Sequence, residues 1–183
     1  MKIADMKVTE LINAVGSDAP APGGGAVAGL AGGIGVALTM MVNGLTLSKK
    51  GFEDDRERIL DAIAKGNELK TRLLNVMDRD TDAFNVVSAA FGMPKDTDEQ
   101  KAERSAAIQN GLKGCTKTPM EMMELIDETL TLAHSLLGRF NDTSASDLGV
   151  AFLSLKAGIQ GAWLNVLINV GSLKDQEFAA EYR

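Results

Sequence analysis

Apolar residues recur every three or four positions along almost all of the 183 residues. This spacing places them on one face of a helix, and strand-like alternation bounded by turn residues is lacking. The pattern therefore predicts an all-α fold, a multihelical bundle of about six to seven helices. We expect seven helices. The first two cover residues 8–15 and 24–47, and the third runs from the charged turn at 49–55 to residue 91, where Pro94 ends it. The others cover 97–115, 119–138, 148–170 and 174–182, with Pro119 in the first turn of the fifth.

Two of the expected helices are almost free of charge. The helix over 24–47 has none, and Lys156 is the one charged residue of 148–170. In the first, Gly25, Gly29 and Gly33 repeat every four residues, so one face is nearly bare backbone and admits a close neighbour. In the second, a small and polar face suits that bare side or a ligand: Gly158, Gly161, Ala162, Asn165 and Asn169. We expect both helices at the centre of the fold.

The first apolar helix could be a membrane span or a helix buried in a soluble protein. Thr39, Asn43 and Thr46 interrupt it, and the rest of the chain is amphipathic and acidic, with a formal charge of -6. These features favour the soluble bundle and argue against membrane or nucleic acid as a partner, because both are bound through clustered Lys and Arg. The length predicts one domain, residues 1–183. The two uncharged helices leave too few others to cover them, which predicts a homodimer.

Cys115 and His134 are the chain's lone cysteine and lone histidine. An internal disulfide, a thiolate metal cluster and a histidine-rich zinc site are therefore excluded, and we expect no metal cofactor. A single free thiol is typical of a reducing compartment, so we expect a cytoplasmic protein.

A carboxylate interrupts the apolar seam of the third helix. Leu73, Met77, Phe84 and Val87 follow the seam, and Asp80 takes a position that the pattern assigns to an apolar side chain. Loss of solvation there would raise the pKa of Asp80 and suit it to proton transfer or to a cationic ligand. An equal alternative places Asp80 at the edge of the seam, paired with a cation elsewhere.

Two loops carry groups that suit a ligand. The glycines of the elbow at 17–25 either permit a tight turn with close packing, or present helix-terminal amides to an anion. The loop at 141–147 is rich in hydrogen-bonding side chains. Ser146 suits the N-cap of the next helix, and Asp147 suits its first turn, so both residues could have a purely structural role. The loop as a whole also suits recognition of a ligand.

Four segments carry a resemblance that covers nearly the whole chain, in order: SDAPAPGGGAVAGLAG, GLTLSKKGFED, MDRDTDAFNVVSAAFGMPKDTDEQKAERSAAIQ and SDLGVAFLSLKAGIQGAWLNVLINV. Together they resemble the cyclodeaminase/cyclohydrolase family. That family includes the C-terminal domain of formiminotransferase-cyclodeaminase and stand-alone bacterial methenyltetrahydrofolate cyclohydrolases. The resemblance implies an all-α homodimer that acts on the one-carbon bridge of tetrahydrofolate, without a metal or nucleotide cofactor.

The resemblance also implies the site residues. The catalytic ones are Asp80, Asp147 and Lys95, and the substrate-binding ones are Pro22, Gly23, Gly24, Gly25, Lys49, Phe84, Asn141 and Ser146. Ser48 and Phe140 depart from the family pattern, which has glycine at both positions in many relatives. The resemblance therefore does not determine the shape of the loop at Phe140.

The expected reaction is hydrolysis of 5,10-methenyltetrahydrofolate to 10-formyltetrahydrofolate. The substrate is a cationic amidinium, and a carboxylate can stabilise it and take a proton from the attacking water. Asp80 fits this role. Asp147 would then hold the pterin, and Lys49 or Lys95 would meet the carboxylates of the glutamate tail. The reverse assignment of the two aspartates stays open.

Two other functions remain. A formimidoyltetrahydrofolate cyclodeaminase would use the same bridge, releasing ammonia after N10 attacks the formimino carbon, and a separate formiminotransferase would be its possible partner. A folate-binding protein without catalysis is the other. We favour the cyclohydrolase because the chain carries no fused formiminotransferase domain.

Overall fold

The computed structural model describes residues 2–183, and most of these residues are helical. The described part contains no strand and six α-helices: α1 (Val8–Val15), α2 (Gly24–Leu47), α3 (Arg56–Phe91), α4 (Asp98–His134), α5 (Ala145–Gly171) and α6 (Gln176–Glu181). Short 3-10 turns cover Ile3–Asp5, Glu53–Asp55 and Asp142–Ser144. The all-α prediction is confirmed, and the bounds of α1 and α2 are as predicted.

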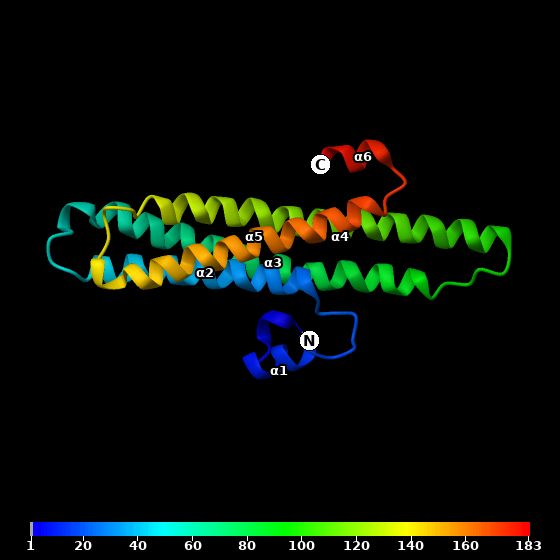
Figure 1. Cartoon of the computed structure of the whole chain (residues 1–183), viewed down its shortest axis with the longest axis horizontal. Helices are drawn as coiled ribbons and strands as arrows, with labels where there is room; N and C mark the ends of the chain where they lie inside the picture. Colours follow the sequence, from blue (N-terminus) through cyan, green and yellow to red (C-terminus); the bar gives the residue numbers. More distant parts are fainter. Residues whose placement is uncertain (1) are drawn as a thin grey trace.

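The four long helices form an up-and-down bundle (Figure 1). Helix α2 packs against α3 and α5, and α4 packs against the same two helices from the opposite corner. Helix α1 lies outside the bundle near the start of α2, where Leu11 packs with Ala26 and Met77. Helix α6 covers the end of α5, with Ala179 buried beside Val170. The hairpin between α3 and α4 extends beyond the other helices.

Small residues let α2 and α5 touch almost backbone to backbone. A Cβ atom on Gly158 would lie 2.9 Å from the backbone nitrogen of Gly32 and 3.0 Å from the carbonyl oxygen of Ala28. Gly29 faces Met77 of α3, as the four-residue repeat predicts. The repeat is wrong at Gly33, where an added Cβ would meet no atom within 4 Å. Because α2 is packed on two sides, its glycines serve two different neighbours.

Helix α4 runs unbroken through Pro119, which corrects the prediction of two helices over 97–115 and 119–138. A proline has no N–H to donate to the carbonyl four residues earlier, here that of Cys115. The side-chain amide of Asn169 on α5 donates to that oxygen at 2.7 Å. A neighbouring helix thus supplies the missing donor, which no local pattern could reveal. Thr97 caps the start of α4, and its side chain accepts a hydrogen bond from the backbone N–H of Gln100.

Helix α5 begins at Ala145, earlier than predicted, and its N-cap position is Ser144. The prediction that Ser146 is the N-cap was therefore wrong, while Asp147 does lie in the first turn. The preceding 3-10 turn starts the helix early. Its cap is Asn141, whose side chain accepts a hydrogen bond from the N–H of Thr143 at 3.2 Å.

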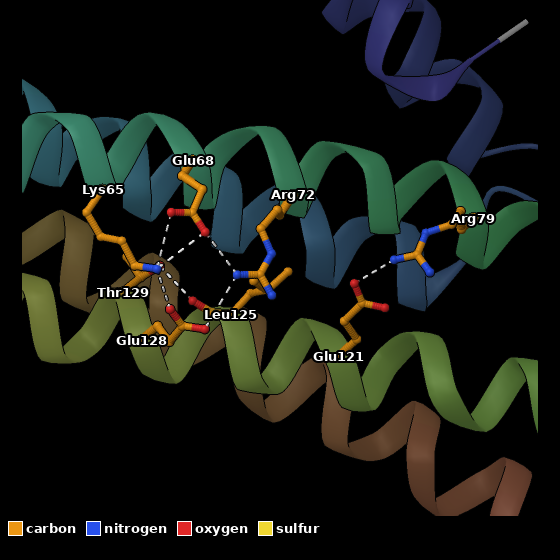
Figure 2. A network of polar contacts seen from close by, with 8 residues as sticks. All are labelled: Lys65, Glu68, Arg72, Arg79, Glu121, Leu125, Glu128 and Thr129. Carbon is orange, nitrogen blue, oxygen red and sulfur yellow. Dashed lines mark hydrogen bonds and ion pairs between the residues drawn. The ribbon is translucent and has the colours of Figure 1, made fainter.

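The surface of the bundle has a charged half and an apolar half. Figure 2 shows the charged half, where ion pairs link α3 to α4: Lys65 and Arg72 both meet Glu128, and Arg79 meets Glu121 at 2.6 Å. Exposed ion pairs add little to stability, at most about 1 kcal/mol each. Their presence marks this half as the one that faces water.

The apolar half is formed by α2 and α5. Its exposed side chains are Val27, Ile34, Met41 and Leu45 on α2, and Val150, Leu153, Leu164, Leu167 and Ile168 on α5. The stretches Gly24–Leu47 and Asp142–Gly171 are each long and apolar enough to cross a membrane. The bundle itself buries more than half of the first stretch but a much smaller share of the second. This face therefore lacks a cover within a single chain.

Candidate functional site

A small hollow lies where the elbow meets the middle of α3. Its volume is about 140 Å³, and its lining joins α2, α3 and α5: Pro20, Ala21, Gly23, Gly24, Gly25, Asp80, Thr81, Phe84 and Asn165. The fold therefore brings together five of the residues that the sequence singled out, namely Gly23, Gly24, Gly25, Asp80 and Phe84. Pro22 belongs to the same elbow.

Asp80 is the one titratable side chain in that lining. The hydroxyl of Thr118 on α4 donates to its Oδ1 at 2.7 Å. The other oxygen, Oδ2, lies directly against Gly25, and a Cβ atom there would collide with it. A side chain at position 25 would thus displace the carboxylate, so this glycine has a role beyond helix packing.

Burial raises the pKa of Asp80, and the hydrogen bond from Thr118 opposes that rise. Within residues 2–183, no lysine or arginine forms an ion pair with Asp80, and its neighbour Arg79 is paired with Glu121 instead. The alternative of a carboxylate at the edge of the seam, paired with a cation, is therefore wrong. What remains is a half-buried acid that opens onto a hollow.

The small, polar face of α5 lies against the bare side of α2, as predicted, and its Asn165 reaches the start of that helix at the elbow. A Cβ on Gly24 would lie 3.4 Å from the side-chain nitrogen of Asn165 and 3.7 Å from its oxygen. That nitrogen donates to the carbonyl of Gly161 at 2.8 Å. Asn165 therefore places an amide group on the hollow that the carboxylate of Asp80 also lines.

Sequence reasoning missed two hydroxyl groups of the site. Thr118 stands just before Pro119, where the sequence pattern predicts a break between helices. Thr81 follows Asp80 directly, and its buried hydroxyl has no hydrogen-bond partner within the part of the chain that the structure describes. A polar residue next to the seam aspartate was the available signal for Thr81, whereas Thr118 had none.

A second cluster lies at the opposite end of α2. The amine of Lys49 donates to the side-chain oxygen of Asn141 at 3.0 Å, and the backbone N–H of Asn141 donates to Thr46 at 3.0 Å. In the nearby first turn of α5, Ser146 is exposed and Asp147 is half-buried. A further hollow beside Lys49 is lined by the cations Lys50 and Arg56 as well.

One chain does not bring the two clusters together. Helix α2 separates them, and its 24 residues span about 36 Å at 1.5 Å per residue. Asp80 and Asp147 therefore cannot meet one small substrate within a single copy. Lys95 joins neither cluster. Helix α3 continues for about 16 Å beyond Asp80 before it ends at Phe91, and Lys95 is exposed in the connection that follows.

The described residues offer no evident set of metal ligands. Among residues 2–183, no group of three or more His, Cys, Asp and Glu side chains is placed to hold a metal ion. Cys115 is buried, and burial, reinforced by the nearby charge of Asp80, raises the pKa of its thiol to about 11. The thiol therefore stays protonated at neutral pH and is a poor nucleophile.

Known proteins match the chain along nearly its whole length. The methenyltetrahydrofolate cyclohydrolase of Methylorubrum extorquens is 37% identical over 174 residues, which cover 95% of this chain and 84% of that protein. The formimidoyltransferase-cyclodeaminase of Sus scrofa is 34% identical over 172 residues, covering 94% of this chain but 32% of that longer protein.

Solved structures agree with this relationship. The formiminotetrahydrofolate cyclodeaminase of Thermotoga maritima matches with a TM-score of 0.86 and 27% identity, over 98% of this chain and 86% of that one. The model of the formiminotransferase-cyclodeaminase family matches residues 7–183. By sequence, by length of match and by fold, the chain belongs to the formiminotransferase-cyclodeaminase family.

Proposed function

We propose that the chain is a methenyltetrahydrofolate cyclohydrolase, which converts 5,10-methenyltetrahydrofolate to 10-formyltetrahydrofolate. The observation that carries this proposal is Asp80, a half-buried carboxylate without an ion pair that lines the elbow hollow. An uncompensated acid of this kind suits a cationic substrate. The name of the similar Methylorubrum extorquens protein supports the same reaction.

In the proposed mechanism, Asp80 acts on the water. The substrate's positive charge is spread over an N–C–N amidinium, which the carboxylate stabilises. Water adds to the bridging carbon as Asp80 accepts one of its protons. The bond from that carbon to N5 then breaks, N5 takes a proton, and the hydroxyl on the carbon loses its own to become the formyl C=O. One proton is released in total, which balances the loss of the cationic charge.

We infer that the complete site is built by a homodimer. A hollow of about 140 Å³ is smaller than the 300–1,000 Å³ of ordinary ligand pockets, so the substrate needs further walls. The uncovered apolar half on α2 and α5 is the surface that a second copy would cover. Val8, Ile12 and Val15 of α1 extend it, because they line one apolar hollow together with Val27 and Ile34.

Two-fold symmetry would unite the two clusters. If two apolar halves pair about an axis perpendicular to α2, the start of each α2 lies beside the end of the other. The elbow hollow of one copy then faces the cluster of Lys49, Asn141, Ser146 and Asp147 in the second copy. In that arrangement Asp147 can accept two hydrogen bonds from the amino-pyrimidine edge of the pterin. Lys49 can meet the carboxylates of the tail.

The same pairing explains the two membrane-like helices without a bilayer. We therefore place the protein in the cytoplasm, free of membrane and nucleic acid. We also propose that it needs no metal or nucleotide cofactor, since the mechanism uses only side chains and water. Dialysis against EDTA should leave its turnover unchanged, and loss of turnover that a divalent metal restores would contradict this part.

A spectrophotometric assay tests the reaction. The absorbance of the methenyl bridge should decline faster with enzyme than in buffer alone, and the product should be 10-formyltetrahydrofolate. The Asp80→Asn variant, which keeps the shape but removes the base, is the matched control. A wild-type rate no faster than buffer would reject the cyclohydrolase.

Cyclodeamination is the second candidate, and the similarity to the Thermotoga maritima and Sus scrofa proteins favours it. The same hollow could protonate the departing amine. Formation of the methenyl absorbance from formimidoyltetrahydrofolate, with release of ammonia, would identify this activity, and a separate formiminotransferase would then supply the substrate. Folate binding with neither reaction would point to a protein that has lost catalysis.

A further inference from the structure

We propose that Thr118 is the positioning residue of Asp80, and that the contact between Asn169 and the backbone ahead of Pro119 holds Thr118 in place. This inference rests on the proposed function of Asp80 as the base. It adds two residues, Thr118 and Asn169, that lie outside the elbow and the loop at 141–147.

The hydroxyl of Thr118 is buried and has one proton to give. It lies 2.7 Å from Oδ1 of Asp80, but 3.4 Å from the carbonyl oxygen of Gly114, so the carboxylate is the better acceptor. With Oδ1 held in this way, Oδ2 is the oxygen that remains toward Gly25 and the elbow. Thr118 therefore decides which oxygen of the carboxylate is available for the water.

The backbone next to Thr118 carries an unusual feature. Because Pro119 has no N–H, the carbonyl of Cys115 loses its helical partner. The side-chain nitrogen of Asn169 donates to this oxygen at 2.7 Å and to the carbonyl of Asn165 at 2.8 Å. One amide group of α5 thus links the turn of α4 that carries Thr118 to the turn of α5 that carries Asn165. The α5 turn lines the hollow through Asn165, and the α4 turn reaches the hollow's carboxylate through Thr118.

No charged group competes with Thr118 for control of Asp80. The elbow and α2 face the carboxylate with proline, alanine and glycine, α5 faces it with Asn165, and α3 with Thr81 and Phe84. Helix α4 contributes Cys115, whose thiol stays neutral because its pKa is about 11. Burial raises the pKa of Asp80, and the Thr118 hydrogen bond is the interaction that lowers it.

Thr118→Val tests the proposal, because valine keeps the shape of threonine and removes the hydroxyl. A general base works only when ionised, so kcat/KM falls as the pH drops through the pKa of Asp80. In Thr118→Val this acid limb should move to higher pH by up to about one unit, the equivalent of one hydrogen bond. Thr118→Ser, which keeps the hydroxyl, should restore the wild-type limb.

Two results would overturn the role of Thr118. One is an unmoved acid limb in a folded Thr118→Val protein. The other is an acid limb of the kcat/KM profile that moves as far in Thr118→Ser as in Thr118→Val. That result would assign the effect to packing of the methyl group. A readout without turnover separates this proposal from the proposed function. The carboxyl signal of Asp80, followed by carbon-13 NMR in the absence of folate, should titrate at higher pH in Thr118→Val even if the protein catalyses another reaction.

A double-variant cycle tests the link through Asn169. Asn169→Leu removes the donor and leaves the carbonyl of Cys115 unpartnered, so the midpoint of urea unfolding should fall and the acid limb should move in the direction seen for Thr118→Val. Adding Pro119→Ala returns a backbone N–H to that carbonyl, and the midpoint should recover. If Pro119→Ala gives Asn169→Leu no recovery, or if Asn169→Leu leaves both measurements at wild-type values, the link is rejected.

Discussion

Asp80 places a carboxylate where an apolar side chain would serve the fold better. Burial raises its pKa, so the folded chain binds a proton more tightly than the unfolded chain does. Below the unfolded pKa both states are protonated and the residue costs nothing. As the pH rises from the unfolded pKa to the raised, folded pKa, the unfolded chain ionises first, and the free energy of unfolding falls. At neutral pH the residue therefore opposes stability, as expected for a group kept for function.

The variant Asp80→Asn should lose function and gain stability. Turnover of the methenyl substrate should fall by about 100-fold or more, the scale of a lost general base. At pH 7 the free energy of unfolding should rise, and the gain over wild type should shrink as the pH is lowered. Urea unfolding of both proteins across that pH range, beside the assay, measures both effects. Normal turnover in the variant would place the base elsewhere.

Asp147→Asn is the informative comparison for the open assignment of the two aspartates. If Asp147 holds the pterin, its loss should weaken folate binding more than turnover. Binding that stays intact while turnover disappears, together with an Asp80→Asn variant that only binds less tightly, would invert the two roles.

Gly25 tests whether the elbow serves the carboxylate or only the packing. Gly25→Ala adds a Cβ that would collide with Oδ2 of Asp80. Turnover should fall by at least about tenfold, because a displaced base loses its alignment with the water. Gly44→Ala is the matched control, since α2 leaves open space around that Cβ, and its turnover should stay at the wild-type level. Equal turnover in all three proteins would return the glycine to a packing role.

Lys49 is the predicted contact of the glutamate tail, in a protein that is acidic overall. Lys50 and Arg56 line the same hollow with one acid, Glu53, so cations outnumber acids in its lining despite the formal charge of -6. Lys49→Ala should raise the Michaelis constant more for polyglutamylated than for monoglutamyl substrate. Steady-state kinetics on the two substrates decides this, and an equal effect on both would remove Lys49 from the tail.

Single residues show where sequence reasoning reached the site and where it stopped. Asp80 could be found because it interrupts a periodic apolar seam, and Asn165 because it shares a helical face with small residues. Thr118 could not, because its hydroxyl meets a carboxylate 38 positions away and nothing local marks that contact. Hydrogen bonds between helices depend on their crossing, which a one-dimensional pattern does not contain.

At the scale of helices, apolar spacing and glycine located most boundaries correctly. The elbow and the charged turn predicted the ends of α2, which runs over Gly24–Leu47 as expected. Pro119 misled, because the usual cost of a proline inside a helix is reduced when another chain segment meets the free carbonyl. Asn169 does so here. The misread break in α4 and the unnoticed role of Asn169 are thus one error.

The contact between α2 and α5 can be tested with a single methyl group. Gly158→Ala would place a Cβ against backbone atoms of α2, which cannot move aside as a flexible side chain could. The free energy of unfolding should fall by roughly 1 to 3 kcal/mol through overpacking. Gly33→Ala should leave it unchanged or raise it by up to about 1 kcal/mol, because alanine favours helix and the space is open.

Urea unfolding at one fixed protein concentration compares the two variants, so that any oligomer contributes equally. A Gly158→Ala protein as stable as Gly33→Ala would show that the two helices do not depend on backbone contact.

At the scale of the whole molecule, two asymmetries coincide. One half of the bundle carries ion pairs and the other carries apolar side chains, and the candidate site residues divide between opposite ends of α2. The sequence predicted the uncharged helices and, through them, a second copy. It could not predict that Asp80 and Asp147 lie too far apart for one site, since that separation depends on which end of α2 each residue packs against, and those contacts join distant parts of the chain.

A shared site makes a prediction that a site within one chain does not. We expect heterodimers of one Asp80→Asn chain and one Asp147→Asn chain, isolated with two different affinity tags, to recover activity. One of their two sites would combine both substitutions, while the other would combine the intact Asp80 of one chain with the intact Asp147 of the other. Turnover should return to about half of the wild-type value, although each variant alone is impaired.

The tagged wild-type heterodimer is the control for purification, and sedimentation at the assay concentration verifies that two chains are present. If each site were built within one chain, every site of the mixed dimer would retain one substitution, and activity would stay at the average of the two variants. That average, or a wild-type protein that turns over substrate as a monomer, would contradict the shared site. Activity above the average of the two variants can arise only when Asp80 and Asp147 act together across two copies.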